Sequence, residues 1–182
     1  MTRSRLALFA VSSVALVLVA ASTASRATAR ARVQEAQPFV TAANPVAAGE
    51  YLTVVAGCHD CHTEGWVEKK GNVPNEDRMT GSTVGFYGPW GTTYSKNLRQ
   101  IVQRHTEDEW VDIMRTADHG EGKMPMPWHD AQKFSDKDLR SMFQYTKSLG
   151  PKPYRLPRNL APGVKPTSSY IDLTVHDSTA GK

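Results

Sequence analysis

The chain has 182 residues, and its 22 Lys and Arg against 18 Asp and Glu give a formal net charge of +4. Removing the first 31 residues would take away four basic residues and no acidic one, leaving 18 of each sign. Nucleic-acid-binding proteins carry a clustered excess of basic charge, so this balance excludes the compositional argument for that class.

Residues 1–31 have the layout of a secretory signal peptide. Two arginines precede an apolar run from Leu6 to Ala21, and small residues with A-x-A spacing follow at 27–31. The apolar run is shorter than the roughly 20 residues of a membrane-spanning helix. We therefore expect cleavage of this leader, with an uncleaved anchor as the alternative, and a linker over residues 32–43.

Residues 44–150 carry the periodic apolar signal and predict one small domain with three capped helices. Asn44, Thr106 and Ser135 are of the residue types that cap helix N-termini, and Thr106 opens a capping box. The helices are expected to run from Pro45 to Gly57, from Glu107 to about Ala117, and from Asp136 to Leu149, before the Gly150-Pro151 stop.

Two other segments lack a helical pattern. Residues 63–97 are rich in Gly and turn-forming residues, and a loop of this length in a small domain usually has a function, such as wrapping the edge of a cofactor. Residues 151–182 contain five prolines and few apolar residues. They predict an extended tail.

The only two cysteines of the chain lie in the run Cys58-His59-Asp60-Cys61-His62. A Cys-x-x-Cys-His sequence is the attachment motif of a c-type haem: each thiol adds to one vinyl group, and the histidine ligates the iron. A redox-active dithiol and half of a zinc site use the same residues and remain as alternatives. We expect His59, inside the motif, to lie at the surface.

A sixth iron ligand is expected in Lys123-Met124-Pro125-Met126-Pro127-Trp128. The two prolines make this loop stiff and non-helical, which suits a thioether held at a fixed place. Met126 is the favoured ligand and Met124 the less favoured one, with a histidine or an open site as further alternatives. The other methionines are expected to fill apolar gaps.

These motifs resemble those of a known family. The span from Ala47 to Leu149 resembles a class I monohaem cytochrome c of the kind found as electron-accepting subunits or partners of bacterial periplasmic dehydrogenases. The segments that carry the resemblance are Gly49–His62, the run Gly88-Pro89-Trp90-Gly91-Thr92-Thr93-Tyr94-Ser95-Lys96-Asn97-Leu98, the Pro125–Trp128 loop and Phe134–Leu139. After Asn97 and Leu98 the chain departs from the family pattern.

The resemblance implies a mostly α fold: a small helical domain around one covalent haem c, followed by the extended Pro-rich tail. It implies that Cys58 and Cys61 hold the haem between His62 and Met126. It also makes Trp90, Tyr94 and Asn97 candidates for contacts with the haem propionates.

The expected function is therefore that of a periplasmic one-electron carrier rather than an enzyme. The resemblance implies a dehydrogenase as electron donor, and an oxidase or another cytochrome of the respiratory chain as acceptor. A membrane association would require a retained leader or a membrane-bound partner. Two alternatives remain: a haem enzyme or gas sensor with an open sixth site, and a haem-free Cys-x-x-Cys oxidoreductase.

Overall fold

The computed structural model describes residues 39–117 and 126–176, which lie in one compact unit that begins at Phe39. The predicted leader, most of the linker and the alternative ligand Met124 lie outside the described residues. Within the described ranges, no helix combines the length and the hydropathy that a membrane crossing needs.

The three capped helices predicted from the sequence are confirmed: α2 (Pro45–Val55), α5 (Glu107–Thr116) and α7 (Asp136–Ser148). Asn44, Thr106 and Ser135 each accept a hydrogen bond from a first-turn N–H through the side chain. Shorter elements lie between them: α3 (Cys58–His62), the 3₁₀ turn η1 (Asn75–Asp77), α4 (Leu98–Ile101) and α6 (Trp128–Ala131).

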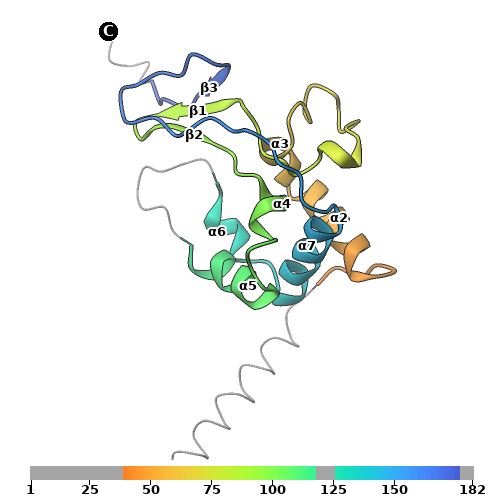
Figure 1. Ribbon diagram of the computed structural model, residues 1–182. Coiled ribbons are helices and arrows are strands. Elements are labelled where there is room, and N and C mark those ends of the chain that lie inside the picture. The colour runs from red at the N-terminus through yellow and green to blue at the C-terminus, as the bar shows by residue number, and fades with distance from the viewer. Residues whose placement is uncertain (1–38, 118–125, 177–182) are drawn as a thin grey trace, which may run out of the picture. The chain divides into compact units, whose positions relative to one another are not determined.

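The hydrophobic core lies among these helices (Figure 1). Its buried members are Leu52, Val102, Trp110, Val111, Met114, Ala131, Leu139, Met142 and Phe143. α2 crosses α7 closely at Gly49, where an added Cβ would lie only 2.0 Å from the Ser141 carbonyl oxygen. This crossing fixes α2, and hence the turn that follows it, against the core.

A small mixed sheet accompanies the helices, in the order β2-β1-β3. β1 (Gly85–Gly88) and β2 (Gly91–Tyr94) form an antiparallel hairpin, and β3 (Tyr170–Asp172) lies parallel to β1 on its other side. Leu160 forms an isolated bridge with Thr92 of β2.

The expected mostly α fold with an extended tail is therefore wrong. Part of the segment predicted as a loop, 63–97, forms the hairpin, and the Pro-rich segment after α7 returns to the sheet and supplies β3 (Figure 1). The reason is that strands of three or four residues carry little periodic signal, and β3 is specified by pairing with a strand about 85 positions earlier in the chain.

Candidate functional site

The Cys-x-x-Cys-His segment is a single helical turn, α3, separated from α2 by Ala56 and Gly57. Gly57 has φ +69°, a left-handed conformation that ends α2 and that L-residues with a Cβ rarely adopt. Cys58 and Cys61 are three residues apart in this turn, so both side chains lie on the same face of the helix.

Both thiols are free and partly buried. Burial raises the pKa of Cys58 to about 11; a backbone hydrogen bond acts in the opposite direction, and the neighbouring Cys61 and Asp60 add to the increase. Burial also raises the pKa of Cys61, followed by the charge of Asp60. The thiols are therefore protonated at neutral pH, whereas a redox-active dithiol depends on a thiol of lowered pKa.

His62 is oriented by the chain that follows the hairpin. Its Nδ1 lies 2.8 Å from the carbonyl oxygen of Lys96. A carbonyl only accepts, so Nδ1 carries the proton and the neutral ring keeps its lone pair on Nε2. Burial lowers the pKa of His62, which favours this neutral ring, although the bond to Lys96 acts in the opposite direction.

The backbone after the motif is also held. The N–H of Gly81 donates to the carbonyl of His62 at 2.9 Å, and the N–H of Met79 donates to Thr63 Oγ1 at 2.9 Å. Met79 and Thr63 are both almost wholly buried. α3 is therefore fixed at both ends, by Gly57 before it and by the 79–81 segment after it.

His59 was expected at the surface, and this prediction is wrong: its side chain is wholly buried. Its ring stacks on Trp66 with centroids 4.2 Å apart. Nδ1 lies 2.8 Å from Thr63 Oγ1, and Nε2 lies 3.4 Å from Thr53 Oγ1. The Thr53 hydroxyl donates to the carbonyl of Glu50, so it accepts from His59 Nε2–H and leaves Nδ1 as an acceptor.

This histidine network was missed because its contacts come from both flanking segments. Thr53 precedes His59 by six residues, on α2, and Trp66 follows it by seven. The His59–Thr63 spacing of four residues was the one local signal in the sequence. The network ties the motif turn to α2 from the inside.

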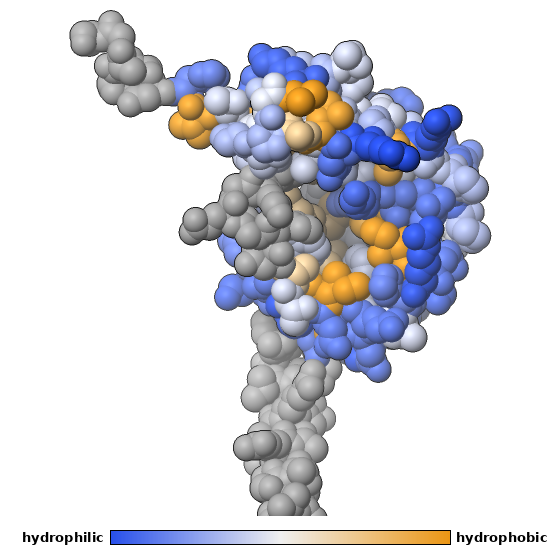
Figure 2. All heavy atoms as spheres, turned by 60° about the vertical axis from the view of Figure 1, so that its left-hand side comes forward, coloured by the Kyte–Doolittle hydropathy of each residue, from blue (hydrophilic) through white to orange (hydrophobic). Residues whose placement is uncertain are grey.

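Met126, the favoured sixth ligand, is partly buried and packs against the same hydrophobic core as Cys58. Its carbonyl accepts the N–H of Trp128, 2.9 Å away, at the start of α6. Figure 2 shows apolar side chains gathered around a hollow on one face of the molecule. An apolar recess is what a porphyrin would require from this fold.

The structure places the three predicted propionate contacts in bonds within the chain. The Trp90 indole donates to the carbonyl of Phe86 at 3.4 Å, and the Tyr94 hydroxyl lies 3.3 Å from Ser168 Oγ. Asn97 caps α4, and its amide also donates to the carbonyl of Lys152 at 2.9 Å. Of these three residues, Asn97 lies next to the motif, because the residue before it, Lys96, accepts the hydrogen bond from His62.

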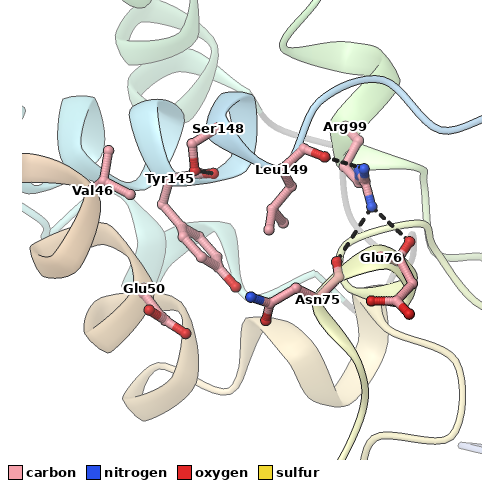
Figure 3. A pocket seen from close by; sticks show the side chains of 8 residues that line it. All are labelled: Val46, Glu50, Asn75, Glu76, Arg99, Tyr145, Ser148 and Leu149. Carbon is pink, nitrogen blue, oxygen red and sulfur yellow. Dashed lines mark hydrogen bonds between the residues drawn. The ribbon is translucent and has the colours of Figure 1, made fainter.

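A pocket of about 430 Å³ lies away from the cysteines, between α2, η1, α4 and α7 (Figure 3). Its lining residues are Val46, Glu50, Asn75, Glu76, Arg99, Tyr145, Ser148 and Leu149. Arg99 is buried and donates to four backbone carbonyls, those of Asn75, Glu76, Leu149 and Gly150. We interpret this guanidinium as a structural tie between η1 and the end of α7.

The residue types of the α3 turn are those that covalent attachment of a haem requires. Over 39–117 and 126–176, no group of three or more His, Cys, Asp and Glu side chains could hold a metal ion. The α3 turn offers two thiols outside any disulfide and an oriented imidazole.

Comparison with known proteins found no matching family model, no matching curated protein and no matching solved structure.

Proposed function

We propose that this chain is an exported one-electron carrier that holds one c-type haem through thioether bonds from Cys58 and Cys61. His62 is the proposed proximal ligand and Met126 the proposed distal one. The observation that carries the proposal is the hydrogen bond from His62 Nδ1 to the Lys96 carbonyl. His62 lies in the same helical turn, α3, as the two thiols.

This bond supports ligation because it fixes both the tautomer and the plane of the imidazole. Histidine ligands commonly donate the N–H that does not face the metal to a carbonyl or carboxylate, which fixes the ring and raises its basicity. The imidazole of His62 has this arrangement through its bond within the chain alone, and its Nε2 keeps a free lone pair.

The thiols support haem attachment over dithiol chemistry. In a Cys-x-x-Cys oxidoreductase the attacking thiol is activated by a lowered pKa. Here burial raises the pKa of both cysteines. A pair of neutral, partly buried thiols on one helical face, beside an oriented imidazole, is instead suited to fixing an apolar cofactor.

When bound, such a haem would supply an iron that can take up and release one electron, and ligation by the Met126 thioether would raise its reduction potential. The part of the chain is to hold and shield the group. Partners are then other redox proteins of the periplasm, a dehydrogenase as donor and an oxidase or cytochrome as acceptor, which meet the carrier through a small, weak interface.

The test is a comparison of visible absorption spectra of the protein expressed in a host that attaches c-type haem. The parent, Met126→Ala and the matched control Met124→Ala are compared in the ferric state. The expected result is a c-type spectrum in all three, with the weak far-red band of sulfur-to-iron ligation lost only in Met126→Ala. Haem that resists acid-acetone extraction in the parent, but not after replacement of Cys58 and Cys61 by alanine, demonstrates the covalent link.

Other results assign the site differently. Loss of the far-red band in Met124→Ala alone moves the distal ligand to Met124. A parent without the band that binds carbon monoxide rapidly when reduced indicates an open site, and therefore a haem enzyme or gas sensor. A colourless parent with two titratable thiols refutes the proposal.

A further inference from the structure

Met79 has an unusual backbone conformation in the segment that follows the motif. Its φ is +59°, in the left-handed region that residues with a Cβ rarely adopt, and its side chain is wholly buried. Such a conformation persists only where the surrounding structure holds it. The Met79 N–H donates to Thr63 Oγ1 at 2.9 Å, and its carbonyl accepts from the N–H groups of Leu98 and Arg99 at 3.1 and 3.3 Å. Met79 therefore links the end of the motif to the start of α4.

Gly81 connects the same two parts of the chain from the other end of this short segment. Its N–H donates to the carbonyl of His62 at 2.9 Å. An added Cβ at Gly81 would lie only 2.6 Å from the Ser95 carbonyl oxygen, so this glycine lies against the residue just before Lys96. The Lys96 carbonyl, which accepts from His62 Nδ1, is thus flanked on both sides by residues that contact the 79–81 segment.

The Thr63 hydroxyl joins this segment to the buried histidine inside the motif. Because His59 donates through Nε2 to Thr53, its Nδ1 accepts the Thr63 O–H, 2.8 Å away. The same oxygen accepts the Met79 N–H, so one hydroxyl both donates and accepts. Thr63 is 1% exposed, and the Met79 N–H would therefore be buried without an acceptor if the hydroxyl were removed.

We infer that Thr63 is a positioning residue for His62: its hydroxyl holds the 79–81 segment in the conformation that presents the Lys96 carbonyl to Nδ1. The value of this orientation for an iron ligand rests on the proposed function, whereas the bond itself lies within the chain. Without the hydroxyl, the segment rearranges to give the Met79 N–H another acceptor, and the Lys96 carbonyl moves away from the ring.

The experiment measures how fast the Nδ1–H of His62 exchanges with water, by ¹⁵N-resolved NMR of the full mature chain under reducing conditions. Thr63→Val removes the hydroxyl at nearly constant shape, and Thr63→Ser keeps it. Thr53→Val is the matched control: Thr53 is also 1% exposed and its hydroxyl also bonds to His59, but the Met79 N–H is bonded to Thr63. Far-UV circular dichroism checks that each variant folds.

The Nδ1–H of Thr63→Val is expected to exchange about tenfold faster than that of the parent, the effect of losing about one hydrogen bond. In Thr63→Ser and Thr53→Val the rate should stay within about threefold of the parent. If Thr63→Val does not fold, Gly81→Ala decides, because its Cβ forces the segment away from Ser95 and should accelerate exchange in the same way. If neither folds, the parent decides: its Nδ1–H and the Met79 amide should exchange together, as groups of one cooperative unit do.

An unchanged rate in Thr63→Val overturns the inference, as does an equal acceleration in Thr53→Val or Thr63→Ser. In the parent, an Nδ1–H that exchanges more than about tenfold faster than the Met79 amide also overturns it. A chain that carries no haem refutes the proposed function instead, and the exchange measurement then applies to the colourless chain without change.

Discussion

The buried His59 makes the stability of the fold depend on pH. Burial lowers its pKa from 6.5 to about 4, and the nearby charges of Arg78 and His62 act in the same direction. Because the unfolded chain binds a proton at His59 at a higher pH than the folded chain does, protons favour unfolding between these two values. Above about pH 7, the titration of His59 therefore leaves the free energy of unfolding unchanged. As the pH is lowered from 6.5 toward 4, this titration lowers the free energy of unfolding.

The size of the effect follows from the shift. At 1.36 kcal/mol per pKa unit, the full loss is about 3 kcal/mol, of which about 2 kcal/mol has been lost at pH 5. His59 is wholly buried, so solvent does not screen the effect as it would at the surface. A loss of this size is a large fraction of the 5–15 kcal/mol typical of domain stability.

The assay is urea denaturation of the parent and His59→Gln at several pH values from 7.5 to 4.5. Subtracting the two free energies of unfolding removes the contribution of groups that titrate in both proteins. The expected difference shifts by about 2 kcal/mol in favour of His59→Gln between pH 7.5 and pH 5. His129→Gln, whose side chain is 80% exposed in the parent, is the matched control for the exchange itself. A difference that stays constant over this range refutes the reasoning.

Three further substitutions test the packing of the fold by urea denaturation at neutral pH. Gly49→Ala drives a Cβ against the Ser141 carbonyl and is expected to cost about 3 kcal/mol or to prevent folding, and a cost below about 1 kcal/mol would contradict the close crossing. Arg99→Lys breaks up a set of bonds to four carbonyls and is expected to cost about 2–3 kcal/mol, against no measurable cost for the control Arg104→Lys. Thr106→Ala removes the α5 cap at an expected cost of about 1 kcal/mol, and an unchanged unfolding midpoint would show that the capping box contributes nothing.

The parts of the fold that were predicted correctly are those fixed by neighbours in the sequence. The N-caps at Asn44, Thr106 and Ser135 each bond to an N–H three residues later, so the starts of α2, α5 and α7 could be predicted from the sequence. The α3 turn is a similar case, because the spacing of its cysteines and histidine is itself the motif.

The sheet and the surroundings of the motif could not be predicted in this way. β3 pairs with a strand about 85 residues earlier, the Lys96 carbonyl that orients His62 is 34 positions away, and Arg99 reaches Leu149 across 50. No local propensity specifies such contacts, which depend on how the helices and the Pro-rich segment pack. His59 was placed at the surface for a different reason: its partners Thr53, Thr63 and Trp66 are near in the sequence, but only the folded turn brings their side chains together around its ring.

The sequence by itself determined which atoms are available for chemistry: two thiols and an imidazole within five residues, and a methionine in a Pro-rich loop. Their chemical types and covalent spacing do not depend on the fold. Only the tertiary structure decided how they are presented, because burial raises the pKa of the thiols and a distant carbonyl selects the protonated nitrogen of His62. Electrostatic environment and hydrogen-bond partners come from the packing of segments far apart in the chain.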